Sequence, residues 1–391
     1  MKTSKGPCKN PLSKVQALEC AMVHRKLAWQ CLNLDGFKLS RSHLHLTMKD
    51  YALIYNPSSA AGKSKESFKL ALETLEKLGV SFETRQTDYA GHAIQLAQDL
   101  ANDGYRIIGC GGDGTCNEVF NGAIASSKKP LVGFIPMGSG NDIPGAIGIV
   151  PDIKRACEII AEGFSETCDI GLATNSNDEK RYFIGIGSQG FDAEVTRRAN
   201  KGTKRLKGTQ NYVAATLTTL LYFKNRQIKV SMDNDTFEGE AILAAVGNGP
   251  SYGGWMYMCA EACIHDGTFH VVILGKMPKL RVLINFTKMY TKQHLSLHAI
   301  HSFESKQVKI EMVDPGVTPY LYQVDGEVLG PVPVTYEVIS DGYEFIKPRK
   351  NEVLLEFNKK HEDLIKAGKT KDYLWLLDKE TSQAAKQKEP E

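Results

Sequence analysis

One glycine-rich stretch of the sequence carries side chains suited to phosphate chemistry. It reads GCGGDGTCNE over residues 109–118 and has Asp113 at its centre. Glycine turns let backbone N–H groups approach phosphate oxygens, and a carboxylate beside a phosphate needs a cation between the two anions. The stretch therefore indicates a site for a magnesium-bound nucleotide around Asp113.

The same glycines also satisfy the dinucleotide fingerprint G-x-G-x-x-G at Gly109, Gly111 and Gly114. That fingerprint needs an acidic residue about 20 positions further on, which holds the ribose. Residues 119–141 contain no Asp or Glu. A dehydrogenase that transfers hydride is therefore disfavoured.

A second stretch, YNPSSAAGKS at residues 55–64, ends in the letters of a Walker A loop. A Walker A loop has a glycine five residues before Gly62, where this chain has Pro57. Proline fixes φ and has no N–H to offer a phosphate, so the tight wrap of that loop is not available. The stretch is not a Walker A loop.

The elements that hold these stretches alternate between strand and helix. Short loops between such elements predict a parallel sheet with helices on both faces, a three-layer α/β domain. The predicted strands are 51–55, 80–85, 106–110 and 131–135, and the predicted helices are 65–78, 91–102 and 117–126.

Strand patterns dominate after residue 165 and predict a β-rich, largely antiparallel second domain of the β-sandwich type. Helices are expected over 206–223 and 279–290, and the charged tail from residue 348 is expected to be helical. The predicted strands are 182–186, 227–232, 240–246, 268–274, 307–312, 321–324 and 332–339.

These patterns divide the chain into a leader (1–47), an α/β domain (48–165), a β domain (166–344) and a tail (345–391) that packs back on the first domain or forms a helical extension. The leader holds eight basic and two acidic residues. It is an organelle transit peptide, a disordered arm, or a segment upstream of a natural start at Met48.

Composition supports a folded protein of the cytoplasm. The chain has 391 residues, 42% of them hydrophobic and 24% charged, which suffices for two buried cores. Its nine cysteines include no CxxC pair, so we expect reduced thiols and no zinc site. No apolar run reaches the ~18 residues of a membrane helix, so any membrane contact is expected at the surface.

The motif GGDGTCNE at 111–118, followed by PMGSGND at 136–142, resembles the catalytic domain of the diacylglycerol kinase family. This family includes soluble bacterial lipid kinases and the sphingosine and ceramide kinases. The resemblance extends from Met48 to about Phe345. It implies an ATP- and Mg²⁺-dependent kinase in which a lipid alcohol meets ATP in a cleft between the two domains.

The resemblance also implies which residues surround ATP. NPSSAAGKS matches the family's first nucleotide loop, with Ala60 where a glycine is usual, and Ser139 replaces the more usual threonine of the third loop. The implied nucleotide-binding residues are Asn56, Pro57, Ser58, Ser59, Ala60, Thr87, Gly112, Asp113, Gly114, Thr115, Cys116, Asn117, Glu118 and Ser139.

Two Asp-Gly stretches of the second domain also match family motifs. In ACIHDGTFHVVIL, residues 262–274, the match implies a structural Mg²⁺ at Cys263, Asp266 and Thr268, although such a turn is also a common hairpin device. In QVDGEVLG, residues 323–330, it implies Glu327 as proton acceptor, with Asp325 as its competitor. Asp113 is expected to hold the metal ion that offsets the negative charge of the phosphates.

Two stretches suggest contact with a membrane surface. Residues 197–208 hold six basic residues and no acidic residue. This composition is equally typical of a loop that binds anionic lipid headgroups and of a loop that contacts only water. The predicted helix near residue 280 mixes apolar and basic residues, as a membrane-surface helix or a core-packed helix does. The expected partner is a lipid substrate. No nucleic acid is expected, and a homodimer stays open.

Three other functions remain open at this stage. The related NAD kinases share the GGDG loop and also phosphorylate a hydroxyl. A sphingoid base or ceramide could replace diacylglycerol as acceptor. A non-catalytic nucleotide- or lipid-binding regulator is the third, and Ala60 would be an early sign of it.

Overall fold

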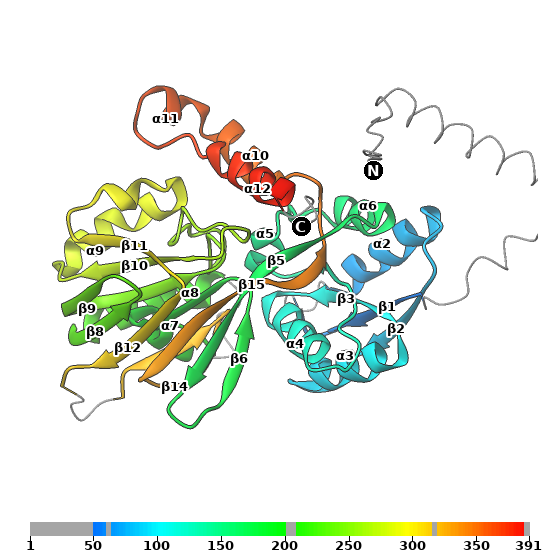
Figure 1. Cartoon of the computed structure of the whole chain (residues 1–391), viewed down its shortest axis with the longest axis horizontal. Helices are drawn as coiled ribbons and strands as arrows, with labels where there is room; N and C mark the ends of the chain where they lie inside the picture. Colours follow the sequence, from blue (N-terminus) through cyan, green and yellow to red (C-terminus); the bar gives the residue numbers. More distant parts are fainter. Residues whose placement is uncertain (1–49, 60–63, 201–208, 315–318, 387–391) are drawn as a thin grey trace, which may run out of the picture. The chain divides into compact units, whose positions relative to one another are not determined.

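The computed structural model describes residues 50–59, 64–200, 209–314 and 319–386. Figure 1 shows the chain coloured along its sequence. The leader, Ala60 and residues 201–208 of the basic stretch lie outside these ranges. Within the described part, no helix combines the length and the apolar character that a membrane crossing requires.

The first half of the described chain is a parallel sheet covered on both faces. Its elements are β1 (Tyr51–Tyr55), α2 (Ser64–Lys77), β2 (Phe82–Gln86), α3 (His92–Asp103), β3 (Arg106–Gly111), α4 (Asp113–Ile124), β4 (Val132–Pro136), α5 (Asp142–Ala146) and α6 (Ile153–Glu162). The strand order is β4-β3-β1-β2. Helix α3 packs on α4, and α2 packs on α6, as Figure 1 shows from the side of the sheet. The expected three-layer α/β arrangement is confirmed.

The second half is built from antiparallel strands. They are β5 (Ser165–Asn175), β6 (Lys180–Phe183), β7 (Ile186–Gly190), β8 (Arg226–Met232), β9 (Thr236–Gly247), β10 (Phe269–Gly275), β11 (Ile300–Ser305), β12 (Gln307–Met312), β13 (Leu321–Val324), β14 (Glu327–Pro331) and β15 (Val334–Ile346). Strands β8 and β12 alternate buried and exposed residues, and their inward side chains Ile228, Val230, Val308 and Ile310 join one core. This period of two explains why the sequence pattern was readable as strands.

Strand β15 connects the two halves through backbone hydrogen bonds. It pairs antiparallel with β5 along most of its length and with β12 over residues 334–337. At its end, Phe345 pairs in parallel with Val132 of β4. The hydrogen-bonded network therefore runs from the antiparallel strands into the parallel sheet without a break.

Some helices of the second half pack on the strands β9 and β10, and the others form a C-terminal group. They are α7 (Phe191–Asn200), α8 (Thr209–Tyr222), α9 (Lys279–Asn285), the 3₁₀ helices η3 (Phe286–Thr291) and η4 (Gln293–Ser296), α10 (Glu352–Lys360), α11 (Glu362–Lys366) and α12 (Trp375–Lys386). The predicted helix over 279–290 is thus a short α-helix followed by a 3₁₀ helix.

The C-terminal helices pack around a buried lysine. The Nζ atom of Lys292 lies over the rings of Tyr257, Phe357 and Tyr373, at 4.7, 4.3 and 3.8 Å from their centroids. Lys292 is 3% exposed, and burial lowers its pKa to about 7. Helix α10 also reaches the first half, because Arg155 of α6 donates a hydrogen bond to Glu352 at 2.9 Å.

Two local expectations need correction. Helix α4 starts at Asp113 and not at residue 117, because Asp113 occupies the first helical position after Gly112. The strand predicted over 182–186 is divided between β6 and β7.

Candidate active site

Three loops meet at the carboxyl edge of the parallel sheet, because β1, β3 and β4 are parallel neighbours. The loop after β1 contacts the glycine turn after β3 where Asn56 Nδ2 donates to Thr115 Oγ1 at 3.1 Å. The glycine turn also contacts the loop after β4, since a Cβ on Gly138 would lie 2.5 Å from Gly112 Cα. The structure therefore brings the three sequence-predicted loops together.

The first loop is held by its own hydrogen bonds. Asn56 Oδ1 accepts from the N–H of Ser58 at 2.9 Å, and its carbonyl accepts from the N–H of Ser59 at 3.2 Å. The carbonyl of Pro57 accepts from Ser64 Oγ at 2.9 Å. This is the turn of an Asx-type loop, in which the N–H groups of Ser58 and Ser59 are used within the loop.

Asp113 is fixed by the third loop. Its Oδ2 accepts from the N–H of Asn141 at 2.8 Å and its Oδ1 from the N–H of Ile143 at 2.9 Å. Gly140 is required beside it, since a Cβ there would lie 2.6 Å from Asp113 Oδ2. Burial raises the pKa of Asp113. The carboxylate of Asp113 also lines the cavity described below.

The remaining predicted nucleotide residues differ in position. The side chain of Cys116 lies in the hydrophobic core and is fully buried. Glu118 Oε1 accepts from the N–H of Gly91 at 3.0 Å and so secures the start of α3. Thr87 is buried, and its N–H donates to the carbonyl of Tyr55 at 2.9 Å. Ser139 lines the cavity described below. Gly114, Thr115 and Asn117 lie in the first two turns of α4.

Asp142 is a site residue that the sequence analysis did not select. Its carboxylate accepts from Ser251 Oγ at 3.2 Å, from the N–H of Gly254 at 2.7 Å and from the N–H of Trp255 at 2.9 Å. Burial first, and then the charge of Asp113, raises the pKa of Asp142. The pair of neighbouring carboxylates concentrates negative charge where a magnesium-bound nucleotide would need a cation bridge.

The two carboxylates of the Asp-Gly-Glu turn have different surroundings. Asp325 is half-buried and accepts four hydrogen bonds: from the N–H groups of Ile184, Gly185 and Ile186 at 3.0–3.1 Å and from Asn117 Nδ2 at 3.1 Å. Burial raises its pKa to about 6. All of its lone-pair sites are in use, so it joins α4 to the start of β7.

Glu327, two residues further on, is half-exposed. It forms an ion pair with Arg181 of β6. Its neighbour Gly326 lines the cavity, whereas Glu327 itself does not. Glu327 therefore lies beside the cavity with its carboxylate held by one partner.

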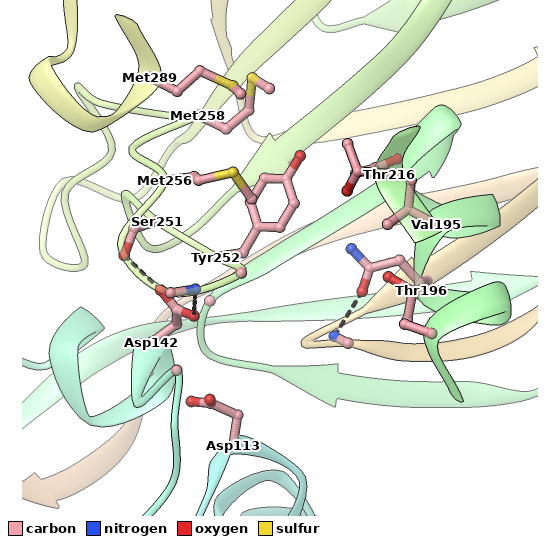
Figure 2. A pocket seen from close by; sticks show the side chains of 18 of the residues that line it. Asp113, Asp142, Val195, Thr196, Thr216, Ser251, Tyr252, Met256, Met258 and Met289 are labelled. Carbon is pink, nitrogen blue, oxygen red and sulfur yellow. Dashed lines mark hydrogen bonds between the residues drawn. The ribbon is translucent and has the colours of Figure 1, made fainter. Parts of the chain in front are cut away.

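A cavity of about 440 Å³ adjoins these groups. Figure 2 shows Asp113 and Asp142 at one end of it and Met256, Met258 and Met289 at the other. Its walls come from both halves of the chain, and the apolar part also includes Phe191, Val195, Leu243, Leu274, Val282 and Phe286. Such a cavity suits a molecule with a polar head and an apolar body.

An exposed apolar surface adjoins the cavity. We call it the apolar rim; it consists of Leu217, Leu221, Tyr222, Leu280, Leu283 and Ile284, each 44–71% exposed. Helices α8 and α9 are in contact here, because Lys279 Nζ donates to the carbonyl of Leu221 at 2.6 Å. Thr216 and Val282, which line the cavity, directly precede rim residues.

In the predicted metal loop, a lysine side chain of the protein pairs with the expected metal ligand Asp266. Asp266 Oδ1 accepts from the N–H and the hydroxyl of Thr268 at 3.0 and 3.1 Å. Asp266 Oδ2 lies 2.5 Å from Nζ of Lys379 in α12. The described residues include no cluster of three or more His, Cys, Asp or Glu side chains placed to hold a metal ion. A metal at Cys263, Asp266 and Thr268 stays a prediction, and the ammonium of Lys379 is its competitor.

The basic stretch is partly neutralised within α7. Arg197 and Arg198 both pair with Glu194, at 2.6 and 2.8 Å. Residues 201–208 of the stretch lie outside the described ranges. Headgroup binding by the stretch therefore stays a prediction.

Two family models match the chain. The diacylglycerol kinase catalytic domain matches residues 50–173. The YegS C-terminal NAD kinase beta sandwich-like domain matches residues 185–346, which agrees with the expected β-sandwich character of the second half. The helices α10 to α12 lie beyond both matches.

Relatives with curated names cover most of the described chain. A diacylglycerol kinase of Staphylococcus saprophyticus subsp. saprophyticus is 29% identical over 307 residues, which cover 78% of this chain and 98% of the relative. A diacylglycerol kinase of Staphylococcus aureus (strain bovine RF122 / ET3-1) is 30% identical over 285 residues, or 73% of this chain and 88% of the relative. A crystal structure of a candidate diacylglycerol kinase from Bacillus anthracis str. Sterne shares the fold, with a TM-score of 0.61 at 20% identity over 77% of this chain and 98% of that one.

Proposed function

Because this chain belongs to the diacylglycerol kinase family, we propose that it transfers the γ-phosphate of ATP to the hydroxyl of a lipid alcohol, such as diacylglycerol, bound in the cavity. The observation that carries this proposal is the composition of the cavity. Carboxylates and glycine loops form one end, and methionine and other apolar side chains form the other. A lipid alcohol has the same division between a reacting head and an apolar body.

The nucleotide is proposed to bind at the three contacting loops. Backbone N–H groups of the turn at Gly112, together with the hydroxyl of Ser139, would face its phosphates, and the loop at Asn56 would flank them. Asp113 lines the cavity next to the glycine turn, and a carboxylate oxygen there suits a Mg²⁺ ion carried by the phosphates. The ion would supply charge stabilisation for the transferring phosphoryl group.

Glu327 is proposed to accept the proton of the attacking hydroxyl. It follows Gly326 at the cavity wall, and one ion pair, to Arg181, holds its carboxylate. Asp325 lines the cavity, but its four hydrogen bonds leave no lone pair for a substrate hydroxyl. We therefore assign Asp325 a positioning role, in which it holds Asn117 of α4 against the start of β7.

The apolar rim is proposed to rest on a membrane surface. Exposed leucine and isoleucine side chains in a patch are unusual for a surface that contacts water alone. The rim adjoins the cavity through Thr216 and Val282. A lipid could then pass from the membrane into the cavity past α8 and α9.

The test is a turnover assay with a panel of acceptors. The purified full chain is incubated with γ-labelled ATP, Mg²⁺ and lipid alcohols in mixed micelles, and labelled lipid is separated by chromatography. We expect transfer to at least one lipid alcohol. Tight binding of nucleotide and lipid without any transfer would instead establish the non-catalytic regulator.

A further inference from the structure

One buried amide beside the Asp-Gly-Glu turn has no function in the scheme above. Gln323 lies in β13, directly opposite Ser188 of β7 in the antiparallel pair. It is 1% exposed and lines the cavity. Its side-chain carbonyl accepts a hydrogen bond from the N–H of Gly326 at 2.7 Å, and its NH₂ group donates to Ser188 Oγ. The amide of Gln323 therefore connects the turn to a buried strand.

The N–H of Gly326 needs an acceptor from outside the turn. Both central residues of the turn, Asp325 and Gly326, have positive φ, 45° and 84°. They form the two-residue loop of the β13–β14 hairpin, a type of loop that positive φ at both positions favours. Such a turn closes with a hydrogen bond between its first and fourth residues, which leaves the N–H of its third residue, Gly326, unused. Gln323 accepts this N–H and so fixes the peptide group between Asp325 and Gly326.

The hydrogen bonds beyond Gln323 fix which way round its amide lies. Burial raises the pKa of Asp192 in α7 to about 6, while hydrogen bonds from the hydroxyls of Ser188 and Tyr252 act in the opposite direction. A serine hydroxyl has one hydrogen, so Ser188 donates it to Asp192 and can only accept from Gln323. The NH₂ group of Gln323 must then face Ser188, and its carbonyl must face Gly326.

This chain of hydrogen bonds acts on the residue that follows Gly326. That residue is Glu327, whose carboxylate forms an ion pair with Arg181. A half-exposed ion pair restrains a side chain weakly, so the backbone of the turn decides how far the carboxylate of Glu327 lies from the cavity. A displacement of about 1 Å at a reacting group can lower the rate about 100-fold. The position of the turn therefore matters for turnover more than for binding.

We propose that Gln323 is a positioning residue, which holds the Asp-Gly-Glu turn so that Glu327 reaches the hydroxyl of the acceptor. The inference rests on the proposed function, because Gln323 acts through the proposed proton acceptor. Ser188 and Asp192 support Gln323 from the side of the protein core by orienting its amide. Gln323 itself takes no part in phosphoryl transfer.

The test measures the effect of Gln323→Met in two backgrounds. Methionine keeps the length of the side chain but has neither the carbonyl nor the NH₂ group. In the wild-type background, kcat should fall about 10- to 100-fold, while KM for ATP is kept because the nucleotide loops belong to the first half of the chain. In Glu327→Gln, which already lacks the base, the same substitution should leave the remaining kcat unchanged. A general loosening of the fold would lower kcat in both backgrounds.

Gln189→Met is the matched control. Gln189 is a buried glutamine of β7, but its amide donates to the carbonyl of Ala244 at 2.6 Å and accepts from Tyr336 Oη at 3.2 Å, away from the turn. The control should lower Tm, because it also removes buried hydrogen bonds. It should keep the wild-type kcat. All kcat values are measured by transfer from γ-labelled ATP at temperatures well below the lowest Tm.

Ser188→Ala serves as a second variant if Gln323→Met does not fold. It keeps Gln323 but removes the hydroxyl that orients its amide. We expect a smaller loss of kcat than for Gln323→Met, and again no loss in the Glu327→Gln background.

The outcomes separate this inference from the proposed function. A loss of kcat that requires Glu327 and that Gln189→Met does not share supports the inference. An unchanged kcat, an equal loss in both backgrounds or an equal loss in Gln189→Met overturns it, while transfer by wild type keeps the kinase function. Normal turnover by Glu327→Gln also overturns it, because no base is then left to position. Absence of transfer by wild type to any lipid alcohol overturns the proposed function itself.

Discussion

The Asp-Gly-Glu turn offers a pair of substitutions whose effects should separate. Asp325→Asn and Glu327→Gln each exchange one carboxylate for an amide of nearly the same shape, two residues apart. Asp325 holds four donors inside the protein, whereas Glu327 is half-exposed with one ion pair. We expect the first substitution to act on stability and the second on turnover.

The size of the stability effect follows from the hydrogen bonds of Asp325. Each of its oxygens accepts two hydrogen bonds. In Asp325→Asn one of these oxygens is replaced by an NH₂ group, which cannot accept, so two donors of the chain lose their acceptor. An unsatisfied buried donor costs about 1–3 kcal/mol, so Asp325→Asn should lose about 2–6 kcal/mol of unfolding free energy. At about 2–4 °C per kcal/mol, Tm should fall by roughly 5 °C or more.

Glu327→Gln should behave in the opposite way. An exposed ion pair contributes about 1 kcal/mol or less, so Tm should change by about 2 °C at most. Loss of the proposed proton acceptor should lower kcat about 100-fold or more while the affinity for ATP is kept.

Two measurements on each variant suffice. Tm is read by scanning calorimetry, and kcat by transfer from labelled ATP at temperatures well below the lower Tm. If Asp325→Asn keeps its Tm and loses turnover, and Glu327→Gln turns over normally, the hydrogen-bond argument is wrong and Asp325 is the base.

Three further predictions follow from the lysines and the rim. Lys292 has a folded pKa of about 7, below its unfolded value, so its contribution to stability is lost as pH falls through 7. The Tm of wild type relative to Lys292→Met should therefore rise between pH 7 and 9, and parallel pH profiles would count against the lowered pKa. Lys379→Met should lower Tm, and added Mg²⁺ should raise the Tm of this variant but not the Tm of wild type. An equal rise of Tm in wild type would place a metal on Asp266 despite the Lys379 ammonium. Replacing Leu280 and Ile284 with Glu should weaken vesicle binding and turnover on vesicle-borne lipid, with unchanged turnover on a short-chain soluble acceptor; unchanged vesicle binding would remove the rim from membrane contact.

Elements bounded by clear turn signals were predictable from the sequence. Strands β1, β12 and β13 have the predicted bounds, because each is a short apolar or alternating run between polar residues. Strand β15 was predicted over 332–339, and the residues that follow include Asp341 and Gly342, which are typical of turns. The structure continues the strand to Ile346 through an irregularity between Ile339 and Tyr343. A bulge and a turn use the same residue types, so composition cannot separate them.

Three residues of the quoted motifs, Asp113, Ser139 and Asp325, line the cavity, while their roles stay predictions. Asp142 was not selected, although it ends the quoted stretch PMGSGND. Its hydrogen-bond partners Ser251, Gly254 and Trp255 are more distant in sequence. Local spacing carries no signal of that relation.

The path of β15 has a consequence for how the protein is made. The chain leaves the first half through β5 and returns along β15, whose last residues occupy the place beside β4 in the parallel sheet. A ribosome therefore releases β1 to β4 long before the strand that flanks β4 has been synthesised. During that interval the outer edge of β4, where Val132 still lacks its partner Phe345, is open to other chains, and newly made protein is most exposed to aggregation. Chaperone dependence and the effect of slow codons should concentrate before residue 346 and fall away once it has emerged.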